Sequence, residues 1–200
     1  GGGGLAAGMA TYLKALDPSV RVIAVEPDDA ACLKAAMLLG EPVPLEHVGI
    51  FVDGCAVRQI GALPFELLRR RIDEVITVDS DQVCAAIRDI FEDTRSIVEP
   101  AGALAVAGIK RWCADNPGVG RNFAAVLSGA NMNFDRLGYV SDRAAVGEQH
   151  EALFGVTIPE KRGAYLDLIR SIGHRAITEF NYRYHGPGEA QIYLGVALKG

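Results

Sequence analysis

The sequence lacks the features that direct a protein to a membrane or a nucleic acid. None of its hydrophobic runs approaches the ~20 residues that a transmembrane helix needs, and no secretory signal is visible. The formal net charge is −5, and the arginines at 69–71 are explained as a helix end, where cations favour the negative pole of the helix dipole. We therefore expect neither nucleic acid nor a membrane as a partner.

Cysteine and histidine are few and lie far apart. The sequence has no Cys-x-x-Cys pair and no His/Cys spacing typical of a metal site. We expect reduced, mostly buried thiols in a cytoplasmic protein, or in a plastid or mitochondrial one if the source is a eukaryote. The cysteines are Cys32, Cys55, Cys84 and Cys113.

The sequence also has no methionine before Gly1, and it stops at Lys199 and Gly200 directly after a strand-like run. We therefore expect an internal segment of a longer protein. Its 200 residues, half of them hydrophobic, are enough for one core and a small second unit.

The most informative feature that is present is the glycine run at the start. Gly1, Gly2, Gly3 and Gly4 are followed by apolar residues at helical spacing, beginning at Leu5. A glycine-rich turn that leads into a helix gathers unpaired amides and the positive end of the helix dipole, which together bind a phosphate. A run of four glycines is also typical of a flexible linker, and taken alone it does not decide between the two.

Farther along the chain, expected strands alternate with expected helices. The strands are 21–26, 74–78 and 123–127, and the helices are 30–39, 65–71, 81–91 and 100–115. Asp79 and Gln82 resemble a capping box ahead of the third helix. This alternation predicts a parallel sheet that binds ligands beyond the carboxyl ends of its strands. The segment 128–131, Ser-Gly-Ala-Asn, follows the last strand and is expected there.

The character of the sequence changes at about residue 147. We expect a strand at 152–158, a helix at 163–172, and strands at 176–184 and 190–198, joined by the hairpin signal at 185–188. This β-α-β-β order is typical of a ferredoxin-like α+β unit that has been cut short of one helix and one strand. We predict a first domain at 1–140, a linker at 141–149 and a second domain at 150–200.

Five motifs in one order resemble fold-type II pyridoxal-phosphate enzymes of the serine/threonine dehydratase family. The tail, with Val-Thr-Ile-Pro-Glu and Thr-Glu-Phe-Asn-Tyr-Arg, is similar to the regulatory domain of the biosynthetic threonine dehydratases (threonine ammonia-lyases). The five motifs are Gly-Gly-Gly-Gly-Leu at 1–5, Val-Glu-Pro at 25–27, Val-Asp-Gly-Cys-Ala-Val at 52–57, Glu-Pro-Ala-Gly-Ala at 99–103 and Ser-Gly-Ala-Asn at 128–131; the tail motifs are at 156–160 and 178–183.

The resemblance implies an α/β fold, with a parallel-sheet catalytic domain like that of tryptophan synthase β followed by a truncated ACT-like regulatory domain. It implies dehydration and deamination of L-threonine to 2-oxobutanoate and ammonia, the first step of isoleucine biosynthesis, with L-serine as a secondary substrate. Isoleucine, valine or both would be allosteric ligands, and the assembly would be a homotetramer. The alternatives are a serine racemase or catabolic dehydratase, which generally lack this tail, and an amino-acid-sensing module without catalysis.

The family's cofactor is pyridoxal 5'-phosphate. The resemblance assigns its phosphate to the backbone amides of Gly1, Gly2, Gly3, Gly4 and Leu5. It assigns the pyridine nitrogen to the hydroxyl of Ser128. A hydroxyl does not hold a proton on that nitrogen as a carboxylate does, which favours elimination over transamination. The alternative for Ser128 is a serine in a turn.

Two further residues carry two interpretations each. Glu99 either interacts with the dipole of a helix that starts at Pro100, or lies near the cofactor ring. Gly54 either lets the backbone pass close to the cofactor or is a plain turn glycine. Asn131 and Asn133 are expected to shape the loop of Ser128.

Two features of the family are missing. Some relatives hold a metal with the acid of Val-Glu-Pro and an aspartate six residues later, but here Cys32 stands six residues after Glu26, so we expect no metal site. The family's Schiff-base lysine lies upstream of the glycine run, in a Ser-x-Lys-x-Arg-Gly context that no segment here resembles. We expect no catalytic residue within this chain, and no activity from the chain alone. The lysines are Lys14, Lys34, Lys110, Lys161 and Lys199.

Overall fold

The computed structural model describes residues 1–118, 120–184 and 188–198. The chain divides into two compact units, Gly1–Ala144 and Ala145–Gly200. Each unit is described by itself.

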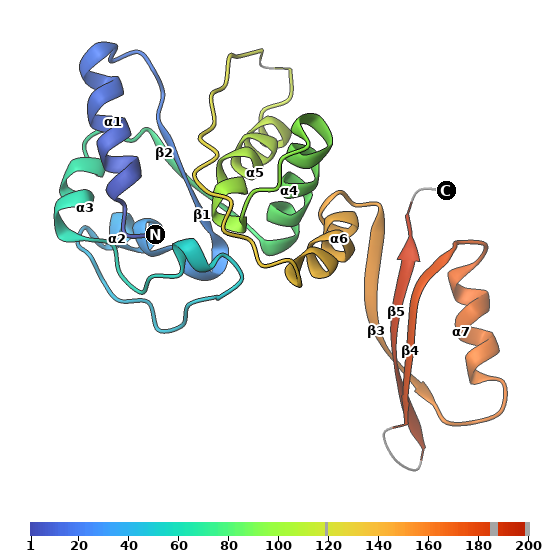
Figure 1. The fold of residues 1–200 in the computed structure, drawn as a ribbon. Helices are drawn as coiled ribbons and strands as arrows, with labels where there is room; N and C mark the ends of the chain where they lie inside the picture. Colours follow the sequence, from blue (N-terminus) through green and yellow to red (C-terminus); the bar gives the residue numbers. More distant parts are fainter. Residues whose placement is uncertain (119, 185–187, 199–200) are drawn as a thin grey trace. The chain divides into compact units, whose positions relative to one another are not determined.

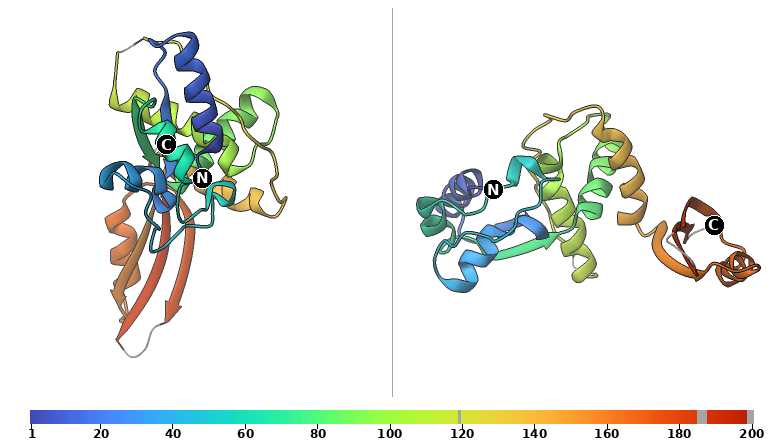
Figure 2. Two further views of the ribbon diagram at one scale, coloured as in Figure 1. Left: turned by 90° about the vertical axis from the view of Figure 1, so that its left-hand side faces the viewer. Right: turned by 90° about the horizontal axis from the view of Figure 1, so that it is seen from below.

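The first unit is built on two parallel strands, β1 (Ile23–Pro27) and β2 (Glu74–Val78), which pair in register from Ile23 with Glu74 to Pro27 with Val78. Helices cover both sides of this sheet, as Figures 1 and 2 show. On one side lie α1 (Gly4–Leu16), α2 (Cys32–Leu39) and α3 (Ala62–Leu68). On the other lie α4 (Ser80–Thr94) and α5 (Pro100–Asp115). Two short 3-10 turns, η1 (Asp28–Ala30) and η2 (Asp53–Cys55), lie in the connections.

Local sequence signals set the ends of these helices as expected. Asp79 Oδ1 accepts a hydrogen bond from the Gln82 amide at 2.8 Å, and Gln82 Oε1 accepts one from the Asp79 amide at 3.0 Å, which confirms the capping box. α2 ends at Gly40, whose φ of 82° suits glycine. Pro100 occupies the first turn of α5, where its missing N–H costs nothing. The strand predicted at 74–78 is confirmed with its bounds, and the strand predicted at 21–26 is found at Ile23–Pro27.

Close packing of α5 on the sheet depends on a glycine. A Cβ at Gly108 would lie 2.3 Å from Cγ2 of Val25 on β1. The helix also packs on α4 in a core that includes Val83, Ile87 and Leu104. The absence of a side chain at Gly108 therefore sets how near the helix lies to β1.

The prediction of a strand at 123–127 is wrong. The structure assigns neither helix nor strand to 120–133, and Phe123 and Leu127 remain 41% and 44% exposed. An apolar run becomes a strand only where a neighbouring backbone offers a hydrogen-bonding ladder, and no described segment does so here. The segment is held instead by tertiary contacts, such as that of the Phe123 ring with Trp112 at 5.4 Å.

Helix α6 (Arg136–Gly147) was missed by the sequence analysis. The segment 141–149, predicted to be a linker, is helical as far as Gly147. Only Val140 and Ala144 of α6 are buried, and such a short apolar stripe gives little periodic signal. The division after Ala144 lies inside the predicted linker, and the assignment of a catalytic and a regulatory domain stays a prediction.

The second unit has the expected β-α-β-β order. Its elements are β3 (Glu151–Pro159), α7 (Ala164–Ile172), β4 (Ile177–Tyr184) and β5 (Glu189–Ala197). The strands form an antiparallel sheet in the order β3-β5-β4, with α7 on one face (Figure 1). Buried side chains of β5, including Ile192 and Leu194, form the core of this unit with Ile158 and Ala164. The hairpin signal at 185–187 lies outside the described residues.

No helix in the described part of the chain combines the length and the apolar character that a membrane crossing requires.

The capping box gives the first testable prediction. Asp79→Ala removes the side-chain acceptor at the start of α4 and is expected to lower the free energy of unfolding by about 1 kcal/mol. Asp93→Ala, in the last turn of the same helix, is the control, because a carboxylate there opposes the helix dipole and its loss is neutral or mildly stabilising. Urea denaturation followed by circular dichroism measures both, and equal effects would contradict the capping role.

Candidate functional site

A cavity of about 500 Å³ lies in the first unit, a size suited to a small ligand or cofactor. It is bounded by the start of α1, the strand β1, the turn η2, the start of α5 and the irregular segment 124–128. Its lining includes every residue to which the sequence analysis gave a place at the cofactor: Gly1, Gly2, Gly3, Gly4, Leu5, Gly54, Glu99 and Ser128. Five segments that are distant in the sequence therefore meet at one site.

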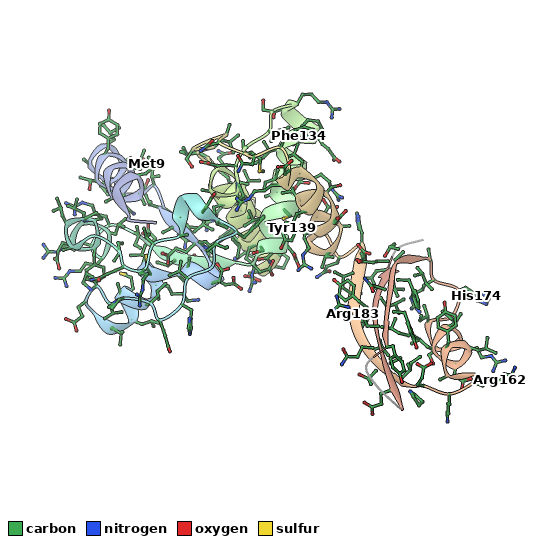
Figure 3. The ribbon with its side chains drawn as sticks, turned by 60° about the horizontal axis from the view of Figure 1, so that its bottom comes forward. Met9, Phe134, Tyr139, Arg162, His174 and Arg183 are labelled. Carbon is green, nitrogen blue, oxygen red and sulfur yellow. The ribbon has the colours of Figure 1, made fainter. Side chains whose placement is uncertain are left out.

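The glycine run leaves the first amides of α1 open toward this cavity. Gly3 is the N-cap residue, with a φ of 85°, and no side chain caps the helix. A Cβ on Gly2 or Gly4 would meet nothing within 4 Å, whereas one on Gly3 would lie 2.8 Å from Cδ1 of Ile60. Unshielded amides at the positive end of a helix dipole form an anion site, and so this cradle fits a phosphate. Met9, on the same helix and labelled in Figure 3, also lines the cavity.

Gly54 lies where two segments approach each other closely. A Cβ there would stand 2.8 Å from Cβ of Ala101 and 3.8 Å from Oε1 of Glu99. A Cβ on Gly1 would in turn lie 3.5 Å from Cα of Cys55. A side chain at Gly54 would therefore push η2 away from the start of α5, which goes beyond the role of a plain turn glycine.

The segment of Ser128 interlocks with the start of α5. The Glu99 amide donates a hydrogen bond to the Gly129 carbonyl at 3.1 Å. A Cβ on Gly129 would fall 2.0 Å from Oε1 of Glu99, and one on Gly102 would fall 2.5 Å from the Gly129 oxygen. Glu99 is thus the N-cap residue of α5 and part of the cavity wall, and its place near a cofactor ring stays a prediction.

Glu26 also lines the cavity, but its carboxylate accepts hydrogen bonds from backbone amides at the start of α2. The side chain is only 3% exposed and accepts hydrogen bonds from the amides of Leu33 at 2.8 Å and Lys34 at 2.9 Å. The Cys32 thiol lies 3.7 Å from the same carboxylate, and burial, followed by the charge of Glu26, raises the pKa of this thiol. The sequence analysis missed this capping role of Glu26, because an acid on the preceding strand has no fixed spacing from the helix that it caps.

No group of three or more His, Cys, Asp and Glu side chains able to hold a metal occurs among the described residues.

No lysine lies among the described residues that line the cavity. Three lysines of the first unit are engaged elsewhere: Lys14 is paired with Asp73, Lys34 with Thr77 and Lys110 with Asp89. Among the described residues, the side chains of the cavity lining therefore offer the carboxylates of Glu26 and Glu99 and the hydroxyl of Ser128, but no lysine amine.

Comparison with known proteins gives close relatives over the whole chain. It is 53% identical to "L-Threonine dehydratase biosynthetic IlvA" of Salmonella typhimurium over 99% of its length, which is 38% of that protein. It is 49% identical to "Threonine dehydratase, mitochondrial" of Schizosaccharomyces pombe, over 100% of the chain and 34% of the relative. The chain thus spans less than two fifths of the length of the curated relatives it matches.

Solved structures agree with these matches. The processed form of threonine deaminase isoform 2 from Solanum lycopersicum superposes with a TM-score of 0.71 and 39% identity, over 72% of this chain and 42% of that one. Serine racemase from Dictyostelium discoideum superposes with a TM-score of 0.60 and 30% identity, over 67% and 42%.

Family models divide the chain much as its structure does. The model of the pyridoxal-phosphate dependent enzymes matches residues 1–129, and that of the C-terminal regulatory domain of threonine dehydratase matches residues 142–200. The first match covers the cavity and all the segments that line it. The chain therefore belongs to the pyridoxal-phosphate dependent enzymes, and its residues 142–200 match the C-terminal regulatory domain of threonine dehydratase.

Proposed function

We propose that a protein carrying this chain at the full length of its relatives, called the full-length protein below, is a biosynthetic threonine dehydratase. It converts L-threonine to 2-oxobutanoate and ammonia and accepts L-serine as a secondary substrate. The observation that carries the proposal is the single cavity that gathers the glycine run, Glu99 and Ser128. The names of the relatives point to the same reaction.

Within this proposal the glycine run holds the phosphate of pyridoxal 5'-phosphate. The open amides from Gly1 to Leu5 and the dipole of α1 supply the charge complement, and no cationic side chain lines the cavity. The cofactor, when bound, supplies an electron sink for the α-carbon of the amino acid. The residues of this chain bind and orient that group.

Ser128 faces the pyridine nitrogen in this proposal and donates a hydrogen bond to it. A hydroxyl leaves the nitrogen unprotonated, and a weaker electron sink suffices when a β-hydroxyl leaves with the electrons. Glu99 and Gly129 hold the Ser128 segment in place through the interlock at the start of α5.

The second unit is proposed to be an ACT-like regulatory domain that senses isoleucine, valine or both, and the assembly is proposed to be a homotetramer. The match of residues 142–200 to the regulatory domain supports the feedback role. A compartment that keeps thiols reduced, either cytoplasm or organelle, fits the free cysteines Cys32, Cys55, Cys84 and Cys113.

Serine racemase is the second candidate, favoured by the structural likeness to that enzyme at 30% identity. The regulatory-domain match argues against it. Chiral analysis after incubation with L-serine separates the two, since a racemase accumulates D-serine and a dehydratase accumulates a 2-oxo acid. A sensing module without catalysis would form neither product and would not hold the cofactor.

The glycine cradle gives the second prediction. In the full-length protein Gly2→Val places a side chain where no protein atom lies within 4 Å, so the fold accepts it while a bound phosphate is crowded. We expect cofactor affinity to fall by about ten-fold or more, corresponding to about 1.4 kcal/mol. Gly8→Val is the matched control, because its Cβ is also free and Gly8 does not line the cavity. Equal cofactor dissociation constants for wild type and Gly2→Val, read from cofactor absorbance, would overturn the phosphate assignment.

The absence of a lysine from the described cavity lining gives the third prediction. The isolated 200-residue chain, shown to be folded by circular dichroism, is expected to form no 2-oxobutanoate from threonine, because no lysine lines its cavity. Because Gly1 lines the cavity, its α-amine is first blocked by acetylation, and added cofactor is then expected to show no absorbance band of a covalently held form. Turnover by rigorously purified chain would show that one of its own lysines can reach the cofactor.

Ser128 gives the fourth prediction. In the full-length protein Ser128→Asp is expected to protonate the ring nitrogen, so that 2-oxobutanoate formation falls and racemised or transaminated products rise. Ser128→Ala loses one neutral hydrogen bond and is expected to weaken cofactor binding by about 0.5–1.5 kcal/mol. Ser96→Asp, on an exposed loop outside the cavity, is the control. If Ser128→Asp keeps the wild-type product pattern and cofactor affinity, then Ser128 is only a serine in a turn.

A further inference from the structure

The guanidinium of Arg136, in the first turn of α6, contacts several residues at and just before the start of η2. Its Nη1 donates a hydrogen bond to the Phe51 carbonyl at 3.3 Å, and its Nη2 donates one to the Ile50 carbonyl at 3.5 Å. Nη1 also lies 3.3 Å from Oδ2 of Asp53. The guanidinium carbon stands 5.9 Å from the centre of the Phe51 ring, and that ring packs on Tyr139 of α6, labelled in Figure 3, at 5.2 Å.

The carboxylate of Asp53 links the Arg136 guanidinium to the backbone that lines the cavity. Its second oxygen, Oδ1, accepts a hydrogen bond from the Gly54 amide at 3.0 Å. Gly54 and Cys55 line the cavity, beside Ala101 on one side and Gly1 on the other. A continuous path of contacts therefore runs from Arg136 through Asp53 to the backbone that forms one wall of the cavity.

The start of α6 is also connected along the chain to the Ser128 segment, which forms another part of the cavity wall. Chain continuity joins it to the Ser128 segment across eight residues, and two turns tighten that connection: Met132 donates to the Ala130 carbonyl at 2.8 Å, and Arg136 to the Asn133 carbonyl at 3.0 Å. The body of the helix is fixed, since Val140 and Ala144 are buried and Arg143 pairs with Asp81. The start of α6 thus contacts the loop before η2 through Arg136 and is joined through two turns to the Ser128 segment.

We propose that Arg136 is a positioning residue of the cofactor pocket, which acts through Asp53 to hold Gly54 and Cys55 against the start of α5. This inference rests on the proposed function for the identity of the cofactor. Arg136 and Asp53 are 31% and 59% exposed, and an ion pair so exposed contributes little by itself. The planar fork of arginine matters because it reaches two carbonyls and a carboxylate together, which a lysine ammonium does not.

The test uses the full-length protein and the variants Arg136→Gln, Arg136→Lys and Asp53→Asn, together with the double variant Arg136→Gln/Asp53→Asn. Amide hydrogen exchange over residues 50–56 is measured without cofactor, and the dissociation constant of pyridoxal 5'-phosphate is measured by absorbance. Arg111→Gln is the control, because it breaks another half-exposed Arg–Asp pair, with Asp115, at a site outside the cavity. Asp53→Asn preserves the size of the side chain, so it remains informative should an Arg136 variant fold poorly.

We expect exchange at Gly54 to accelerate about ten-fold in Arg136→Gln and Asp53→Asn, and cofactor affinity to weaken by about 3- to 10-fold, the range of one or two hydrogen bonds. Arg136→Lys is expected to retain part of the wild-type protection of Gly54 and part of the cofactor affinity. The double variant is expected to show effects little larger than those of each single variant. Arg111→Gln is expected to change neither the exchange of Gly54 nor the cofactor affinity.

Unchanged exchange at Gly54, or faster exchange with unchanged cofactor affinity, would overturn the positioning role, as would additive effects in the double variant. Because hydrogen exchange is measured without cofactor, it tests the contacts from Arg136 through Asp53 to Gly54 independently of cofactor binding. Failure of the wild-type protein to bind pyridoxal 5'-phosphate would instead refute the proposed function, and with it the role of Arg136 at that cofactor.

Discussion

The contact between the first turn of α5 and the Gly129 peptide is the constraint on which the candidate site depends. The Glu99 amide holds the Gly129 carbonyl, while the bare α-carbons of Gly102 and Gly129 allow the two backbones to meet. Ser128 belongs to a segment without strand or helix, so this contact, rather than a ladder of hydrogen bonds, holds it beside the cavity. A methyl group at Gly129 would overlap the Glu99 carboxylate, so the Glu99 side chain would have to leave its present place.

Glycines serve this site in two physically different ways. Gly2 and Gly4 have free space where a Cβ would stand, and this space leaves the amides at the start of α1 open to an anion. Gly54, Gly102 and Gly129 instead have protein atoms in that place: the side chain of Ala101, the backbone of Gly129 and the side chain of Glu99, respectively. The first group leaves open space beside the amides at the start of α1, and the second lies where segments of the cavity wall pack closely.

Charged side chains near the cavity mostly stabilise its walls. Glu26 is buried and accepts hydrogen bonds from amides at the start of α2. Asp53 links Arg136 to the Gly54 amide. Local electrostatics therefore holds the backbone in shape, and the backbone in turn presents the amides. This arrangement suits a group whose own phosphate and ring supply the charge, as expected for a pyridoxal-phosphate dependent enzyme.

The sequence by itself determined the elements whose signals are local. The sequence analysis predicted the capping box at Asp79, the C-terminal Gly40 of α2 and Pro100 at the start of α5, because each depends on neighbours within a few residues. The apolar runs of β1 and β2 were also predicted, but they became strands because they pair with each other. Tertiary structure decided the rest. It left 123–127 irregular because a strand needs a partner, and it fixed α6 through Val140 and Ala144 on one narrow stripe. It also gave Glu26 and Arg136 their partners, since contacts across 7 and 85 residues leave no pattern in a single sequence.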